Sequence, residues 1–282
     1  MSQLIANKTQ IQLQNFINNP SHSLLLNGEK GVGKLTLGRY LVSSVLEVPL
    51  DKLDNYPYFK VITPDDGKNI GIDVVRELDH FLSLKTVSSN SISRVILIDN
   101  SQFLSLEAQN ALLKMLEEPP EDTLFILSVS NPNSLLTTIK SRMQLINVMK
   151  PEIIEVKAFF KKEGFNEIEI NKAASMTGGL PGLMYAILND EEHPLKKATK
   201  LAREILSKST YDRLVMVDDL SKDRELLKDT LYILKQMAHI SLLNDVDPIK
   251  WKTILKSSYE ANELIELNSQ PKLCLDKLML SL

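Results

Sequence analysis

The feature that most constrains the fold of this chain is a glycine-rich segment, GEKGVGKLT, at residues 28–36. An apolar run at residues 24–26 precedes it and has the composition of a buried strand. The pattern at residues 37–46, which follows it, has the spacing of a helix. The glycine and lysine spacing is that of a Walker A loop, in which backbone N–H groups surround phosphate oxygens at a helix start. The sequence therefore predicts a strand–loop–helix unit built for phosphate.

The loop departs from the Walker A pattern at one position. Four residues are the expected phosphate contacts: Gly28, Gly31, Gly33 and Lys34. The pattern next requires Ser or Thr, whose hydroxyl binds the magnesium ion, and this chain has Leu35. Thr36 has a hydroxyl, but one helical step turns it by roughly 100° away from the metal. A phosphate loop without its metal ligand indicates an NTPase fold that has lost turnover.

Length, charge and cysteine count limit the class of protein. A chain of 282 residues has room for two or three domains. Its net charge of −3 gives no global basic field, so contact with DNA would need a local patch. The single cysteine, Cys274, excludes an internal disulfide and a multi-cysteine zinc site. The polar N-terminus and the lack of a long apolar run predict a cytoplasmic protein without a membrane span.

The first half of the chain alternates between strand and helix patterns. The expected strands are residues 23–27, 58–62, 95–99, 124–130 and 144–148. The expected helices between them are residues 37–47, 72–84, 105–118 and 134–140. Continuous apolar strands alternating with helices indicate a parallel sheet covered on both faces. The sequence thus predicts an α/β domain with five strands.

The second half contains only helical patterns. The expected helices are residues 151–162, 166–176, 183–188, 195–207, 210–220, 222–243, 248–265 and 270–281. The polar residues 189–194 have the composition of a linker. We therefore predict three domains: an α/β domain at 1–148, a small helical domain at 149–190 and an all-helical domain at 191–282.

A second element of a phosphate site lies about 65 residues after the loop. Four apolar residues end in Asp99, which is typical of a Walker B strand whose Asp helps to hold magnesium. In an active ATPase of this type the next residue is usually Glu, the base that orients the attacking water. Here it is Asn100, and an amide cannot accept the proton of that water.

Three strings carry a resemblance to a known family: HSLLLNG at residues 22–28, IGIDVVREL at 70–78 and NALLKMLEEPP at 110–120. They resemble the AAA+ clamp-loader subunits of bacterial DNA polymerase III, most of all the delta prime branch. The resemblance covers residues 1–190 and is most specific at 105–142. It implies an AAA+ P-loop sheet followed by a helical lid and an all-α collar through which subunits join.

The resemblance assigns further roles. SRM at residues 141–143 matches the SRC box, so Arg142 would be an arginine finger, catalytic in a neighbouring subunit's ATP site; a plain surface arginine is the alternative. Ser130 or Asn131 would be sensor 1, and each would either bond a phosphate or cap the next turn. Gly182 stands where ATP-hydrolysing relatives have the sensor 2 arginine.

Three groups needed for hydrolysis within one chain are thus replaced at Leu35, Asn100 and Gly182, while the group that acts on a neighbour, Arg142, is kept. This asymmetry predicts a non-hydrolysing subunit and leaves its enzymatic status uncertain. The loop would either hold ATP or ADP without turnover or stay empty. Residues 48–57, where related subunits carry a four-cysteine zinc module, contain no cysteine, so neither zinc nor another bound metal is expected.

The resemblance also implies partners. These would be the gamma/tau ATPase and delta subunits, the sliding clamp, and primed DNA reached through the complex, with no membrane. Two alternatives remain: an ATP-hydrolysing subunit of the gamma/tau type, and a clamp-independent AAA+ protein that binds DNA. The net negative charge argues against strong DNA binding by the chain alone.

Overall fold

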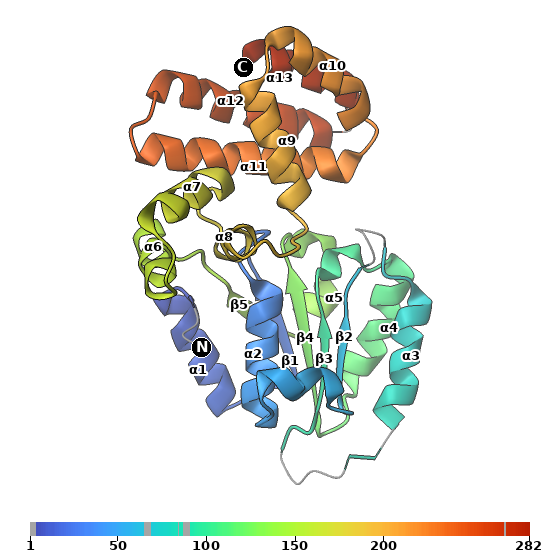
Figure 1. The fold of residues 1–282 in the computed structure, drawn as a ribbon. Coiled ribbons are helices and arrows are strands. Elements are labelled where there is room, and N and C mark those ends of the chain that lie inside the picture. The colour runs from blue at the N-terminus through green and yellow to red at the C-terminus, as the bar shows by residue number, and fades with distance from the viewer. Residues whose placement is uncertain (1–3, 65–68, 84, 87–90, 268) are drawn as a thin grey trace. The chain divides into compact units, whose positions relative to one another are not determined.

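The computed structural model describes residues 4–64, 69–83, 85–86, 91–267 and 269–282. The chain divides into two compact units, Met1–Pro151 and Glu152–Leu282 (Figure 1). Each unit has a hydrophobic core of its own. In the described ranges, no helix has the length and apolarity needed to cross a bilayer.

The first unit is built on a five-stranded sheet in the order β2-β3-β4-β1-β5. Its strands are β1 (Ser23–Asn27), β2 (Phe59–Ile62), β3 (Arg94–Ile98), β4 (Thr123–Val129) and β5 (Gln144–Asn147). Every pair is parallel, and all residues of β3 and β4 are buried. Burial on both faces explains why these strands read as continuous apolar runs. The five-stranded parallel sheet predicted from the sequence is confirmed.

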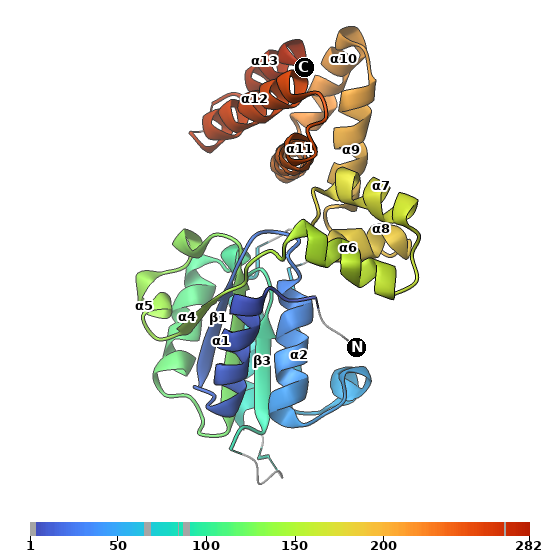
Figure 2. The same ribbon diagram turned by 90° about the vertical axis from the view of Figure 1, so that its left-hand side faces the viewer.

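Helices cover both faces of the sheet, as the sequence predicts. The helices of this unit are α1 (Asn7–Asn18), α2 (Lys34–Leu46), α3 (Ile72–Ser83), α4 (Leu106–Glu117) and α5 (Thr137–Lys140), with short 3-10 turns η1 (Leu50–Asn55), η3 (Ser101–Phe103) and η4 (Pro132–Ser134). Alternate residues of β1 enter opposite cores: Leu24 packs with α1 and α2, and Leu25 with α3 and α4. Figure 2 shows α2 and α4 on opposite sides of the strands.

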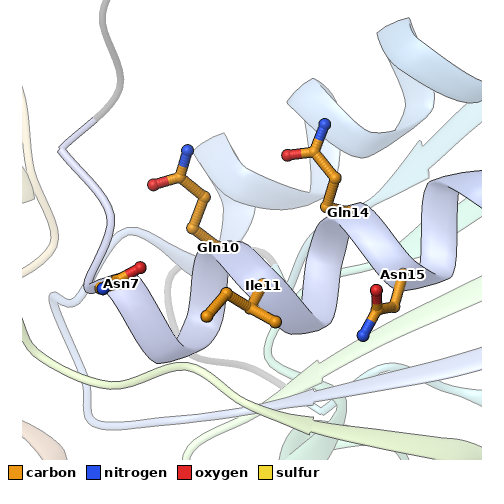
Figure 3. A pocket seen from close by; sticks show the side chains of 5 residues that line it. All are labelled: Asn7, Gln10, Ile11, Gln14 and Asn15. Carbon is orange, nitrogen blue, oxygen red and sulfur yellow. The ribbon is translucent and has the colours of Figure 1, made fainter.

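Helix α1 is an element that the sequence pattern did not predict. Its buried face is narrow, with only Thr9, Leu13 and Phe16 buried, and its first residue has no side-chain cap. The outer face carries carboxamides around one exposed isoleucine, Ile11 (Figure 3). Packing on the sheet rather than intrinsic amphipathicity therefore stabilises this helix.

The second unit is entirely helical in its described part. Its helices are α6 (Ile153–Lys162), α7 (Glu167–Thr177), α8 (Pro181–Leu188), α9 (Lys196–Ser207), α10 (Thr210–Leu220), α11 (Arg224–Leu243), α12 (Pro248–Glu266) and α13 (Pro271–Ser281). One apolar cluster runs from Leu180 to Met279. The division into a lid and a collar near residue 190 stays a prediction.

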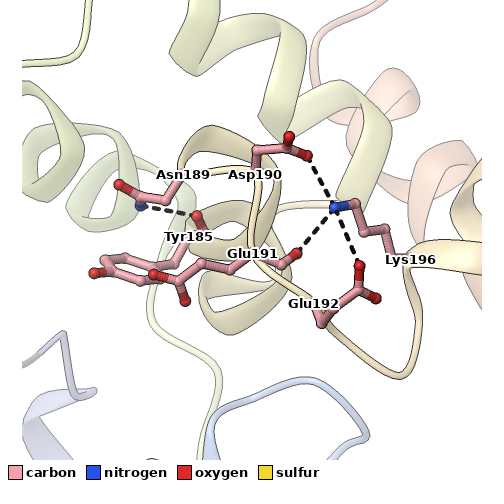
Figure 4. A network of polar contacts seen from close by, with 6 residues as sticks. All are labelled: Tyr185, Asn189, Asp190, Glu191, Glu192 and Lys196. Carbon is pink, nitrogen blue, oxygen red and sulfur yellow. Dashed lines mark hydrogen bonds and ion pairs between the residues drawn. The ribbon is translucent and has the colours of Figure 1, made fainter.

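The segment at residues 189–194, predicted to be a linker, is held by the side chain of Lys196, the first residue of α9 (Figure 4). The Lys196 ammonium donates to the Asp190 carboxylate at 3.0 Å and to the Glu191 carbonyl at 3.1 Å. The Glu192 carboxylate lies 4.0 Å away. The hydrogen bond to Asp190 holds the pKa of Lys196 above its ordinary value. These contacts define the conformation between α8 and α9.

Gly178 is the C-cap residue directly after α7, and there the chain lies against Gln236 of α11. The residue has φ +65°, and a Cβ atom placed there would lie 2.3 Å from the Cβ of Gln236 and 2.7 Å from its carbonyl carbon. Only glycine therefore fits this position, for both its backbone conformation and its contact.

We expect Gly178→Ala to destabilise the second unit by about 3 kcal/mol, from the left-handed conformation and the forced repacking together. Gly164→Ala is the matched control, because Gly164 has φ +96° but no atom within 4 Å of the added carbon. That control should cost about 1 kcal/mol. Denaturant unfolding followed by the fluorescence of Trp251, the only tryptophan, measures both. Equal losses in the two variants would contradict the crowding at Gly178.

Candidate nucleotide and arginine-finger sites

The glycine-rich segment forms a loop between β1 and α2 whose conformation requires glycine. Gly31 and Gly33 have φ of 80° and 93°, and Gly33 is the N-cap residue directly before α2. Gly28 is needed for a different reason, because a Cβ there would lie 2.6 Å from the carbonyl oxygen of Val148. These positions give the loop the backbone of a phosphate cradle at a helix start.

The side chain of Lys34 lies inside this loop and is only 6% exposed. Its ammonium donates to the carbonyls of Gly28 at 2.9 Å and Glu29 at 3.0 Å. A third hydrogen bond reaches the hydroxyl of Ser130 at 2.9 Å. An ammonium has three N–H donors, so all three are bonded to the protein. Lys34 thereby connects the loop by a hydrogen bond to Ser130, the residue directly after β4.

Burial sets the protonation of Lys34. Desolvation lowers the pKa of its ammonium from 10.5 to about 8, and the nearby charge of Asp99 opposes that shift. Lys30 acts in the same direction as burial through charge repulsion. A phosphate group at this position would stabilise the charged form, since an opposite charge raises the pKa of a lysine.

The carboxylate of Asp99 follows β3 and is also buried. One oxygen accepts a hydrogen bond from the Ser128 hydroxyl, and the other accepts one from the Asn100 amide at 2.7 Å. Leu35 stands at the Walker A position of the metal-binding hydroxyl and packs against the core, and Thr36 is exposed. Among the described residues, no group of three or more His, Cys, Asp or Glu side chains has the arrangement of a metal site.

The structure separates the two candidates for sensor 1. Ser130 accepts the hydrogen bond of Lys34, whereas the Asn131 side chain accepts from the backbone N–H of Asn133 and caps the turn η4. Gln102 joins the same network, because its carbonyl oxygen accepts from the N–H of Ser130 at 3.3 Å and its amide donates to Asn100 at 3.1 Å. Sequence reasoning missed Gln102 and Ser128; the one signal for Ser128 is a hydroxyl directly after four apolar residues of β4.

Arg142 lies at the amino-terminal ends of the strands, opposite the carboxyl-terminal ends where the phosphate loop lies. The Ser23 hydroxyl, at the start of β1, donates to the Arg142 carbonyl at 2.6 Å. The phosphate loop follows the far end of the same strand, about 15 Å away at 3.3 Å per residue. The adjacent Met143 is buried in the core, so the side chain in the Cys position anchors the turn. Arg142 therefore cannot reach the phosphate loop of its own chain.

The guanidinium of Arg142 is fixed but accessible. It makes an ion pair with Glu117, the last residue of α4, at 2.8 Å, and donates to the Thr138 carbonyl at 3.0 Å. Its side chain is 37% exposed. Gly182, at the expected sensor 2 position, lies in the first turn of α8 in the second unit.

The sheet order, the phosphate loop and the residues at the ends of β3 and β4 define a P-loop domain of the AAA+ class. A family model described as "DNA polymerase III, delta subunit" matches residues 5–152, more than half of the chain. The chain belongs to this family.

Individual relatives agree with that assignment. The chain is 29% identical over 183 residues to DNA polymerase III subunit delta' of Haemophilus influenzae, which covers 60% of this chain and 55% of the relative. It is 26% identical over 257 residues to the tau subunit of Bacillus subtilis, covering 77% of this chain and 45% of that one. The chain thus spans about half the length of the curated relatives it matches. The resemblance to delta prime subunits is confirmed.

A solved structure shares the fold. The crystal structure of a DNA polymerase III gamma subunit-related protein from Thermotoga maritima aligns with a TM-score of 0.52 at 19% identity. The alignment covers 97% of this chain and 98% of that one. At this identity the likeness concerns the fold alone.

The low pKa of Lys34 makes stability depend on pH. Between pH 8 and 10.5 the unfolded chain binds a proton at this site that the folded chain has released, so the free energy of unfolding rises with pH in that window. We expect wild type to gain on the order of 2 kcal/mol relative to Lys34→Met between pH 8 and pH 10. Urea titrations across this range measure the difference, with Lys8→Met, an exposed position on α1, as control. A difference that stays constant with pH would contradict the burial of a titrating Lys34.

Proposed function

We propose that this chain is a delta prime-like subunit of the DNA polymerase III clamp loader that does not hydrolyse ATP itself. In this role it supplies Arg142 to the ATP site of a neighbouring gamma/tau-type subunit during ATP-dependent loading of the sliding clamp onto primed DNA. The single observation that carries the proposal is the contrast between the two edges of the sheet. The loop edge, meaning the carboxyl-terminal ends of the strands with the phosphate loop, has Leu35 and Asn100 in place of the groups for hydrolysis. The opposite edge, at the amino-terminal ends, presents the fixed and accessible Arg142.

The loop edge supports the absence of turnover. Hydrolysis requires a metal to neutralise phosphate charge and a base to orient water. Leu35 has no metal-binding atom, and both oxygens of Asp99 are bonded to Ser128 and Asn100. The amide of Asn100 donates a hydrogen bond here and cannot serve as a base. Loss of such groups typically lowers rates by orders of magnitude.

The opposite edge supports a role in trans. Arg142 and the phosphate loop lie at the two ends of β1, so this arginine has no phosphate of its own chain within reach. A guanidinium aimed at a neighbour's transferred phosphoryl group stabilises the charge that develops there. The matched family and relatives make gamma/tau-type subunits the proposed neighbours.

The remaining partners follow from the same proposal. They are the delta subunit, the sliding clamp, and primed DNA bound through the whole complex in the cytoplasm. A net charge of −3 supports DNA contact by the assembly rather than by this chain alone. We propose that the chain binds no zinc, because its single, buried cysteine cannot supply the four thiolates of a zinc module, and we propose no other bound metal.

For the phosphate loop, we propose weak binding of ATP or ADP without turnover and without dependence on magnesium. The nucleotide phosphates would accept the hydrogen bonds that the Lys34 ammonium now donates to Gly28, Glu29 and Ser130. In this proposal no side chain of the loop coordinates a magnesium ion. Calorimetric titration of ADP should give the same Kd in magnesium and in EDTA, and Lys34→Met should abolish binding. A Kd that tightens tenfold or more with magnesium would show a metal ligand and contradict the proposal.

The central prediction concerns Arg142. In a complex assembled with the cognate ATPase and delta subunits, Arg142→Ala should lower clamp- and DNA-stimulated ATP turnover at the adjacent site by at least about a hundredfold. Arg76→Ala is the control, because Arg76 is also an exposed arginine paired with a carboxylate. Phosphate release measures both variants, and the chain alone should be inert. Equal rates for Arg142→Ala and wild type would overturn the role in trans.

One alternative has its own support. The similarity to the tau subunit of Bacillus subtilis extends over 77% of this chain, which favours an ATPase subunit of the gamma/tau type. Magnesium-dependent turnover by the isolated chain would establish that alternative. Salt-sensitive DNA binding without any clamp-loader contact would instead support the clamp-independent AAA+ protein.

A further inference from the structure

Two helices hold the guanidinium of Arg142. Its Nη2 donates to Oε1 of Glu117, the last residue of α4, at 2.8 Å. Its Nη1 donates to the carbonyl oxygen of Thr138 in α5 at 3.0 Å. Because the two acceptors come from different elements and bind different nitrogens, they restrict both the position and the rotation of the planar group.

The backbone below this group is restrained as well. The Arg142 carbonyl accepts from Ser23, and its N–H donates to the Ile139 carbonyl at 3.1 Å. Ile139 and Met143, on either side in sequence, are buried in the core. The orientation of the guanidinium therefore depends on its side-chain contacts, and the outer one is with Glu117.

The ion pair leaves N–H donors of the guanidinium available for a further ligand. Arginine has five N–H donors, and the described contacts use two of them. The side chains of Arg142 and Glu117 are 37% and 50% exposed. An ion pair with this exposure adds little to the stability of the fold. Its physical effect is to reduce the number of conformations that the Arg142 side chain samples, so less conformational entropy is lost when the guanidinium binds a phosphate.

We propose that Glu117 is a positioning residue for Arg142. It sets the guanidinium in the orientation from which this group enters a neighbouring subunit's ATP site. Glu117 itself touches neither nucleotide nor phosphate. The inference rests on the proposed function of Arg142. It adds that Glu117, in the string at residues 110–120, acts on that function through its ion pair with Arg142.

Two substitutions separate orientation from charge. Glu117→Ala removes the acceptor, and we expect kcat for stimulated ATP turnover in the assembled complex to fall about tenfold with the KM for ATP unchanged. Glu117→Gln keeps an oxygen acceptor in the same place, so its kcat should stay within about threefold of wild type. Glu118→Ala, the next residue and also exposed, is the control and should match wild type.

A second measurement distinguishes positioning from a general effect on α4. In an Arg142→Ala background, Glu117→Ala should cause no further loss, because it acts only through that arginine. A further tenfold loss in that background would assign Glu117 a structural role and overturn the proposal. Unchanged or increased turnover for Glu117→Ala, where Arg142→Ala lowers it, would also overturn it. If Arg142→Ala itself has no effect, the proposed function fails first.

Discussion

The arrangement of the loops at the carboxyl-terminal ends of the strands depends on the hydrogen bonds of the buried Lys34 ammonium. Three hydrogen bonds from one nitrogen connect the loop after β1 with the end of β4. Burying a charge is costly, and the lowered pKa of Lys34 expresses that cost. Two backbone carbonyls and one hydroxyl satisfy this charge within the protein. The residues of the proposed nucleotide site thus also connect two loops of the protein by hydrogen bonds.

The polarity of the parallel sheet then determines what the two edges can do. All strands run in one direction, so every loop that follows a strand lies at one edge and every segment that precedes a strand lies at the other. Lys34, Asp99 and Ser130 meet at the first edge. Arg142 precedes β5 and lies at the second, next to the start of β1. A site that spans both edges is impossible within one chain, which is the physical basis for proposing action between subunits.

Patterns of burial explain which elements were predictable. The strands and the long helices of the second unit bury wide apolar faces, so their positions agree with the periodicity within a few residues, as for α11 and α12. Helix α1 was missed because its three buried side chains are spread along a carboxamide-rich sequence. The segment after α8 is predicted to be a linker from its polar composition, and the structure adds that a carboxylate and a carbonyl of this segment bond to Lys196. Local polarity does not reveal whether polar groups bond to each other.

The sequence by itself determined the phosphate loop, its missing metal ligand at Leu35, the parallel sheet and the candidate arginine, since these depend on residue type and spacing along the chain. Only the tertiary structure decided which groups meet: Lys34 with Ser130, Asp99 with Ser128, and Arg142 with Glu117. It also decided that Asn131 caps a turn while Ser130 faces the lysine. The physical reason is that hydrogen bonds and ion pairs between residues 25 to 96 positions apart depend on how strands and helices are placed in space, and spacing in sequence carries no such information.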